Sequence, residues 1–215
     1  MKKAFIFDMD GTLFDTEMLT QEALRAVSRI HRERDDVDDF YPTVCGSTLP
    51  KAKHLYEAFY GEDYPFYERY DEMHKWIKEF IDKNGIPAKK GAKELLSFLK
   101  ENDYKVAVAT SSPRESTEEH IKNAGFENYF DVMVCGDEIK NSKPHPEIFL
   151  TAAKKLGVSP ENCYVAEDSY NGVEAGVAAG MKVFMVPDMN LPRQKEKDLA
   201  YKICKDLLQI IDYIK

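Results

Sequence analysis

The feature that most constrains the fold is an alternation, from residue 88 onward, of short β-branched apolar runs with amphipathic stretches. The amphipathic stretches at 91–102 and 146–157 place their apolar residues on one helical face. The apolar runs are nearly continuous, as expected of parallel strands that are buried on both faces. Alternating strands and helices predict βαβ units, and therefore an α/β fold with a parallel sheet flanked by helices. The predicted strands are 4–7, 105–110, 131–135, 162–168 and 181–187.

Residues 16–87 interrupt this alternation because they contain no convincing strand pattern. Residues 16–31 have the periodicity of a helix, and Pro42, Gly46 and Pro50 predict loops between further helices. We therefore expect an α-helical domain inserted after the first strand. The expected limits are 1–15 together with 88–215 for the core, and 16–87 for the insert. Aromatic side chains of the insert are expected to form its core rather than a ligand platform; they include Tyr60, Tyr64, Phe66, Tyr67 and Trp76.

Composition narrows the class of partner. The 215 residues carry a formal net charge of −8, which argues against a broad nucleic-acid surface because such surfaces need clustered Lys and Arg. A small anionic molecule remains compatible, since a local positive pocket can exist on an acidic protein. The first apolar run stops after Phe7, too early for a secretory signal, and no segment has the length of a membrane span. The four scattered cysteines suit reduced thiols, so we expect a cytoplasmic protein with no membrane and no obligate protein partner.

Polar side chains stand where several predicted strands end. Asp8 and Asp10 follow the first strand, Thr110 ends the run 105–110, and Glu167 with Asp168 ends the run 162–168. In a parallel sheet the carboxyl ends of the strands share one edge, and ligands bind there. These residues are therefore predicted to converge on one site.

The residue types at this edge suit a metal and a phosphoryl group. Mg²⁺ prefers oxygen ligands and commonly uses one or two carboxylates together with a substrate phosphate. Hydroxyl and backbone donors would bind phosphoryl oxygens, and a lysine ammonium would neutralise their developing charge. The candidate donors and cations are Thr110, Ser111, Ser112, Arg114 and Lys143, with a surface salt bridge as the other interpretation of Arg114.

Each residue also has a plain interpretation. An Asp-x-Asp sequence alone is more often a solvated turn, and a single Thr110 or Lys143 is ordinary at a strand end or on a surface. Glu167, Asp168 or Ser169 would suit the N-terminus of the helix that follows. Taken one at a time, these residues leave the plain interpretations open.

The stretches "DMDGTLFDTE" (8–17), "KPHP" (143–146) and "EDSYNGVEAGVAAGM" (167–181), with Thr110 between the first two, resemble the four motifs of haloacid dehalogenase-like phosphohydrolases. The family has a Rossmann-like core. The position of the helical insert resembles the subgroup with an α-helical cap, which includes sugar-phosphate phosphatases and β-phosphoglucomutase.

The resemblance implies a role for each motif residue. Asp8 would be the nucleophile that forms an aspartyl phosphate, and Asp10 would protonate the leaving alcohol and then activate water. Thr110 and Lys143 would hold the transferring group and the nucleophile. The third acid, Asp15, would lie at the hinge into the cap. The Mg²⁺ ligands would be the Asp8 side chain, the Asp10 backbone carbonyl and Asp168, with Glu167 beside them.

The function favoured by these residues is Mg²⁺-dependent hydrolysis of a small phosphate monoester, a sugar phosphate or related metabolite. The alternative is a mutase, but β-phosphoglucomutases carry a cap histidine and a cap arginine where this chain has Thr20 and Leu49, with Lys51 or Lys53 as possible substitutes. A phospho-receiver is less favoured, because receivers are shorter and lack a helical insert. A non-catalytic binding protein is disfavoured because all four motif positions are filled.

Overall fold

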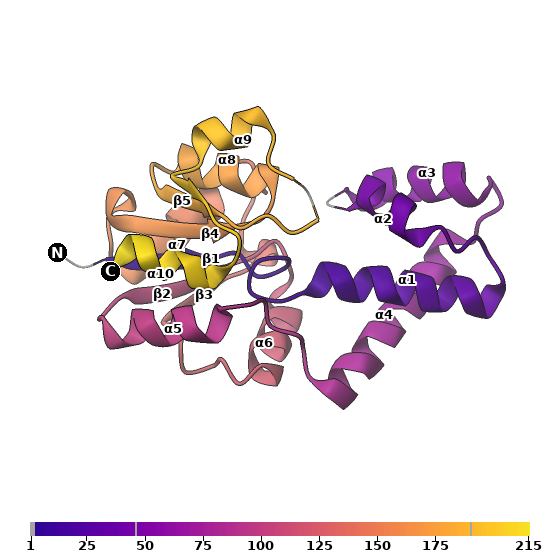
Figure 1. Cartoon of the computed structure of the whole chain (residues 1–215), viewed down its shortest axis with the longest axis horizontal. Coiled ribbons are helices and arrows are strands. Elements are labelled where there is room, and N and C mark those ends of the chain that lie inside the picture. The colour runs from indigo at the N-terminus through magenta and orange to yellow at the C-terminus, as the bar shows by residue number, and fades with distance from the viewer. Residues whose placement is uncertain (1–2, 46, 190) are drawn as a thin grey trace. The chain divides into compact units, whose positions relative to one another are not determined.

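The computed structural model describes residues 3–45, 47–189 and 191–215, and it divides into two compact units. Unit 1 comprises Met1–Asp15 and Ile86–Lys215, and unit 2 comprises Thr16–Gly85 (Figure 1). The chain returns from unit 2 to unit 1 between Gly85 and Ile86, two residues before the expected limit between 87 and 88. Pro87 belongs with unit 1 because its carbonyl accepts a hydrogen bond from the Asp15 backbone N–H at 2.8 Å.

Unit 1 is built on a six-stranded sheet with the order β3-β2-β1-β4-β5-β6, and every neighbouring pair is parallel. The predicted α/β class is confirmed, and all five predicted strands are present. The sixth strand was missed because it is only two residues long, too short for a pattern. The strands are β1 (Ala4–Phe7), β2 (Lys105–Ala109), β3 (Val132–Val134), β4 (Cys163–Glu167), β5 (Lys182–Met185) and β6 (Lys202–Ile203).

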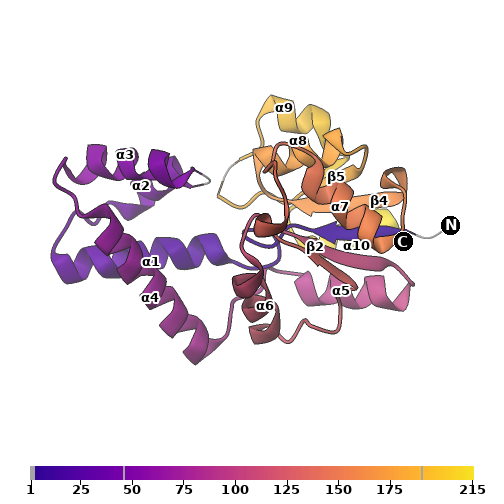
Figure 2. The same cartoon turned by 180° about the vertical axis from the view of Figure 1, so that it is seen from behind.

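Helices cover both faces of this sheet, as the two opposite views show (Figures 1 and 2). On one face α7 and α8 pack against the apolar side chains of β1, β2, β4 and β5. On the other face α5 packs against β2 and α10. The predicted helices at 91–102 and 146–157 are α5 and α7. The helices of unit 1 are α5 (Ala92–Glu101), α6 (Arg114–Asn123), α7 (Glu147–Leu156), α8 (Tyr170–Ala178), α9 (Gln194–Leu199) and α10 (Leu207–Ile214), with short 3-10 turns η1 (Gly136–Glu138) and η2 (Pro160–Asn162).

Unit 2 is helical throughout its described residues, as expected for the insert. Its helices are α1 (Thr16–His31), α2 (Val37–Val44), α3 (Leu49–Tyr60) and α4 (Phe66–Asn84). The expected break at Pro42 is wrong, because Pro42 lies inside α2, which ends only two residues later. Pro50 stands in the first turn of α3, a position where its missing N–H costs no helical hydrogen bond. The expected loop residue Gly46 lies outside the described residues.

Aromatic side chains form much of the core of unit 2. Tyr64 and Phe66 are buried, and the Tyr60 and Tyr64 rings stack with their centroids 4.5 Å apart. The prediction is wrong for Tyr67, whose side chain is 58% exposed because it lies on the solvent face of α4. Trp76, the last of the predicted core aromatics, is half-buried, and its ring stacks on that of Phe80.

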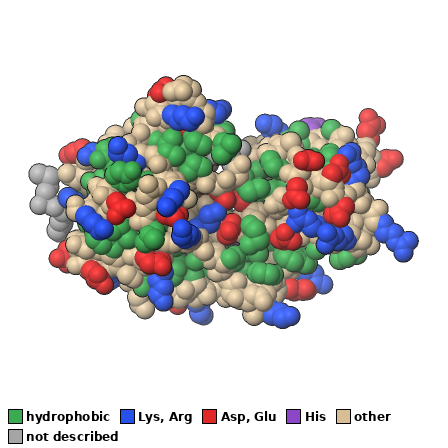
Figure 3. All heavy atoms as spheres, in the orientation of Figure 1, with side chains coloured by type: hydrophobic (Ala, Val, Ile, Leu, Met, Phe, Trp, Pro, Cys, Tyr) green, Lys and Arg blue, Asp and Glu red, His purple; other side chains and the backbone are tan. Residues whose placement is uncertain are grey.

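Charged side chains of both signs lie on the surface. On the face drawn in Figure 3, acidic and basic side chains are interspersed and are not gathered by sign. No helix in the described part of the chain is long and apolar enough to cross a membrane. Nor do the four cysteines form a disulfide within the described residues.

Candidate active site

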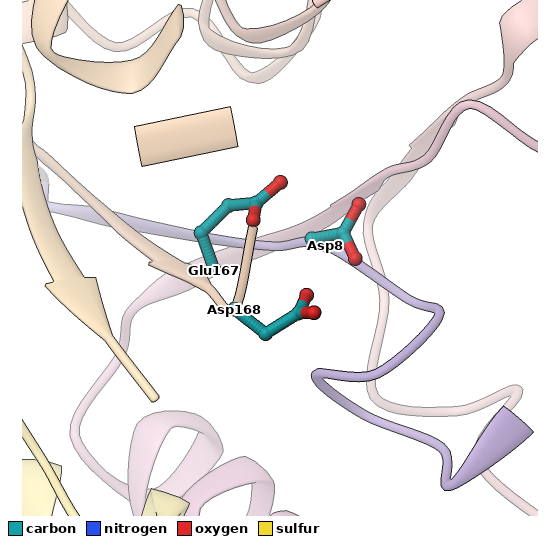
Figure 4. A group of neighbouring side chains, drawn as sticks. All are labelled: Asp8, Glu167 and Asp168. Atoms are coloured by element: carbon teal, nitrogen blue, oxygen red, sulfur yellow. The ribbon is translucent and has the colours of Figure 1, made fainter. Parts of the chain in front are cut away.

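The register of the sheet brings the predicted site residues together. Phe7, the last residue of β1, lies opposite Val108 of β2 and Ala166 of β4. The chain therefore carries Asp8 past the end of β1 at the same level as Glu167, which ends β4. Figure 4 shows the side chains of Asp8, Glu167 and Asp168 grouped together. The sequence predicted that these strand ends bring the acids together, and in the structure Asp8, Glu167 and Asp168 lie side by side.

Lys143 reaches these acids from the loop between η1 and α7. Its Nζ donates to Asp8 Oδ1 at 2.5 Å, to Glu167 Oε1 at 2.8 Å and to the Ala109 carbonyl at 3.3 Å. Only 7% of its side chain is exposed, so it is not the ordinary surface lysine of the plain interpretation. A buried ammonium between two carboxylates offsets their repulsion and leaves a positive group at the sheet edge.

Burial dominates the electrostatics of the acids. It raises the pKa of Asp8 to about 8, against the opposing effect of Lys143, while the nearby Glu167 raises the pKa further. Asp168 also has a pKa well above its usual range, first through burial and then through the charges of Glu167 and Asp8. For Lys143, burial alone would lower the pKa, but the two carboxylates raise it overall. The upward shifts of Asp8 and Asp168 come first from burial, which disfavours the charged form of each acid, and only then from the neighbouring carboxylates.

The donor set fits a divalent cation. One carboxylate oxygen from each of Asp8, Glu167 and Asp168 lies within 4.8 Å of the others, and Mg²⁺ prefers such oxygens. Gly11 leaves room for this group, because a Cβ there would stand 2.6 Å from Asp168 Oδ2. Its φ of +78° is a second reason for glycine at this position.

Glu167 and Asp168 have different surroundings within this group. Both Glu167 oxygens accept hydrogen bonds, Oε1 from Lys143 and Oε2 from the Ser169 N–H and hydroxyl at 2.7 and 2.9 Å. Asp168 accepts one bond on Oδ1, from the Thr12 hydroxyl at 2.9 Å. Asp8 and Asp168 therefore have more capacity to bind a cation, and Glu167 chiefly holds Lys143.

Asp10 lies apart from the three grouped carboxylates. Its Oδ2 accepts from the Ser112 hydroxyl at 2.6 Å and from the Thr110 hydroxyl at 3.3 Å. Ser112 was expected to donate to a phosphoryl group, but here its hydroxyl is directed to this carboxylate. Its neighbour Ser111 is exposed.

Arg114 is engaged elsewhere, at the start of α6. Its Nε donates to Glu138 at 2.6 Å, and its two terminal nitrogens reach Glu118 at 3.1 Å and the Met133 carbonyl at 3.0 Å. These contacts favour the interpretation of Arg114 as a salt-bridge residue over a substrate ligand.

Sequence reasoning gave no role to two further pairings. The Thr12 hydroxyl orients Asp168, and its place in the "DGT" of the first motif was the available signal. Lys89 binds Asp188 at 2.6 Å and Asp15 at 3.3 Å, joining the unit boundary to the loop after β5. No local pattern connects these positions, because they meet only through the fold.

Comparison with known proteins agrees with the motifs. A profile of the haloacid dehalogenase-like hydrolases matches residues 2–180. A phosphorylated carbohydrates phosphatase from Thermotoga maritima is 38% identical over 186 residues, covering 84% of this chain and 82% of the relative. Hexitol phosphatase B from Escherichia coli K12 is 31% identical over 216 residues, covering 95% and 96%.

A solved structure is similar over the whole length. It is a Thermotoga maritima protein proposed to be a beta-phosphoglucomutase, with a TM-score of 0.81, 33% identity and full coverage of both chains. The family profile spans most of the sequence, and the sheet edge holds the motif residues in one site. The chain therefore belongs to the haloacid dehalogenase-like hydrolases.

Proposed function

We propose that this hydrolase is a Mg²⁺-dependent phosphatase of the cytoplasm that cleaves a small phosphate monoester through an aspartyl phosphate on Asp8. The observation that carries the proposal is the buried Lys143 ammonium between Asp8 and Glu167, with Asp168 alongside. The group combines a nucleophile, a fixed cation and a site for a metal at the edge of the sheet where ligands bind.

Each residue has a chemical role in the proposal. An Asp8 oxygen attacks phosphorus while the bond from phosphorus to the alcohol oxygen breaks. Asp10 gives a proton to that oxygen, and it later takes one from the water that hydrolyses the aspartyl phosphate. Lys143 neutralises the charge of the transferring phosphoryl group, and Thr110 orients that group. Mg²⁺, held by Asp8, Asp168 and the Asp10 carbonyl, would supply positive charge to the phosphoryl oxygens and favour the carboxylate form of its ligands.

The substrate class in the proposal is a sugar phosphate or a related metabolite. The relatives named as a phosphorylated carbohydrates phosphatase and a hexitol phosphatase support it. Unit 2 serves as the cap that excludes water from the reaction in this proposal, which also favours a metabolite over a folded phosphoprotein.

A mutase is the second candidate, because one similar structure is proposed to be a beta-phosphoglucomutase. Two observations within unit 2 favour hydrolysis. The Thr20 hydroxyl donates to the Thr16 carbonyl of its own helix at 2.9 Å, and Leu49 offers no polar group. Neither position supplies the basic side chain that a second phosphate needs.

The test is release of inorganic phosphate from a panel of hexose, pentose and hexitol phosphates and nucleotides, with Mg²⁺ or with EDTA. We expect multiple turnovers on one group of substrates, abolished by chelation and by Asp8→Asn. Glu101→Gln, a similar neutralisation at the exposed end of α5, is the matched control and should retain turnover. Absence of release by folded, Mg²⁺-loaded protein would contradict hydrolysis, and interconversion of glucose 1-phosphate and glucose 6-phosphate would establish the mutase.

A further inference from the structure

The two oxygens of Asp10 are in different environments. Oδ2 accepts two hydrogen bonds, from Ser112 Oγ at 2.6 Å and Thr110 Oγ1 at 3.3 Å. Among the described residues, none donates a hydrogen bond to Oδ1. The two hydroxyl donors therefore hold Oδ2 in place, and Oδ1 is the oxygen that keeps its hydrogen-bonding capacity.

Ser112, which donates the shorter of these two hydrogen bonds, is also bonded to Thr110, the donor of the longer one. The Ser112 backbone N–H donates to Thr110 Oγ1 at 3.0 Å, so Thr110 accepts from the same residue whose hydroxyl binds Asp10. Thr110 is buried at the end of β2, which fixes its position. Ser112 is therefore held through its backbone while its side chain holds Asp10.

This geometry separates Ser112 from the groups that bind phosphate. A serine hydroxyl has a single proton to donate, and here that proton is directed to Asp10 Oδ2. It is then not available to a phosphoryl oxygen while Asp10 keeps this orientation. The hydroxyl acts on the acid–base residue and not on the phosphoryl group.

We propose that Ser112 is a positioning residue that sets which Asp10 oxygen performs proton transfer, an inference that rests on the proposed phosphatase activity. With Oδ2 held, Oδ1 presents its proton to the leaving alcohol. As the bond between phosphorus and the alcohol oxygen breaks, its electron pair takes that proton and the neutral alcohol departs. The resulting Asp10 carboxylate keeps its two hydroxyl donors on Oδ2, and Oδ1 is free to take a proton from the hydrolytic water.

The experiment compares two leaving groups, using kcat/KM because it reports the steps up to alcohol release. An alkoxide needs the proton from Asp10, whereas 4-nitrophenolate departs as a stable anion. The probes are 4-nitrophenyl phosphate and the best sugar or hexitol phosphate of the panel. For Ser112→Ala, we expect kcat/KM for the alkyl substrate to fall about tenfold more than for the aryl substrate, a part of the roughly 10²- to 10⁴-fold supplied by general acid catalysis.

Three controls separate positioning from other effects. Ser112→Thr, which restores a hydroxyl, should recover most of the alkyl-to-aryl ratio. Ser111→Ala is the same change on the adjacent exposed residue. It should leave the alkyl-to-aryl ratio unaltered, even where it lowers kcat/KM equally for both substrates. The inhibition constant of orthophosphate should be unchanged in Ser112→Ala, because the proposal assigns Ser112 no bond to the phosphoryl group.

An equal loss on both substrates, or no loss on either, would overturn the inference and leave the phosphatase intact. A weaker orthophosphate affinity with an unchanged ratio would make Ser112 a phosphate ligand instead. If wild-type protein hydrolyses neither substrate while Mg²⁺ is present, the proposed function itself fails. The three results are distinguishable within one set of assays.

Discussion

At the scale of single residues, the site is an accumulation of buried charge that depends on close contacts. Removing one partner of a buried ion pair leaves an uncompensated charge, which costs about 3–5 kcal/mol. Lys143 and Glu167 are such partners, with side-chain exposures of 7% and 1%. Room for Glu167 is provided by Gly172 in α8, where a Cβ would stand 1.6 Å from Glu167 Oε1.

Gly172→Ala should therefore displace Glu167 and, with it, Lys143. Alanine suits a helix better than glycine, but we expect a net loss of about 1–3 kcal/mol of unfolding free energy from overpacking, together with a large loss of kcat/KM. Urea unfolding and phosphate release measure the two effects. Gly176→Ala is the control, because its Cβ would meet the apolar Val183 at 2.6 Å and no carboxylate. Equal catalytic losses per folded molecule in both variants would contradict a role for the Glu167 position.

Which residues meet at the site follows from the strand ends, and that much is readable in the sequence. Asp8 directly follows one predicted strand, Thr110 and Glu167 stand at the ends of two others, and the parallel register brings these strand ends together. The partner of each oxygen is not readable, because it depends on loop conformation. Ser112 bonding to Asp10 and Arg114 pairing with Glu138 are both settled in the loop and helix after β2.

At the scale of elements, two helices in the described part of the chain begin with an N-cap side chain that accepts a backbone hydrogen bond. Ser169 accepts from the Gly172 N–H at the start of α8, and Asp206 accepts from the Gln209 N–H at 3.0 Å at the start of α10. The first cap was among the interpretations of "EDS" in the sequence. Asp206 also pairs with Lys90 at 2.8 Å, which ties α10 to the start of α5.

Asp206→Ala should lower the unfolding free energy at neutral pH by about 1 kcal/mol, the usual value of a cap. The hydrogen bond from Lys90, and then that from Gln209, hold the pKa of Asp206 below its usual range. A lowered pKa stabilises the fold above the unfolded-state value of about 3.9, and this contribution is lost as pH falls through the folded-state pKa. The difference in unfolding free energy between wild type and variant, measured by urea unfolding, should be smaller near pH 3 than at pH 7. Asp206→Asn should keep most of the cap, and a gap independent of pH would contradict the electrostatic part.

At the scale of the whole molecule, the two units differ in how much the sequence reveals. The change from alternating strands and helices to helices alone located the insert, with one limit displaced by two residues. The arrangement inside unit 2 was less accessible, because Pro42 within α2 and the exposed Tyr67 depend on which helix faces pack. Periodicity identifies a helix more readily than it identifies the neighbour of that helix.

Mg²⁺ should stabilise the folded protein through unit 1, since it relieves the repulsion among Asp8, Glu167 and Asp168. Binding only to the folded state at a hundredfold excess over Kd contributes about 2.7 kcal/mol. Thermal unfolding followed by circular dichroism should shift upward in Mg²⁺ relative to EDTA for wild type, and much less for Asp168→Asn. Asp137→Asn, an acid in η1 outside the group, is the matched control. An unreduced shift in Asp168→Asn would place the stabilising ion elsewhere.

The strand order also has a consequence for synthesis. β1 lies inside the sheet, between β2 and β4, yet it is synthesised before the other five strands of that sheet. All of unit 2 is made before β2 is available to pair with it, and β4 follows only at Cys163–Glu167. The helical unit can therefore fold while the strand that precedes the catalytic acids still waits for its neighbours. The acids at Asp8 and Asp10 are the first part of the site to be translated and among the last to acquire their surroundings.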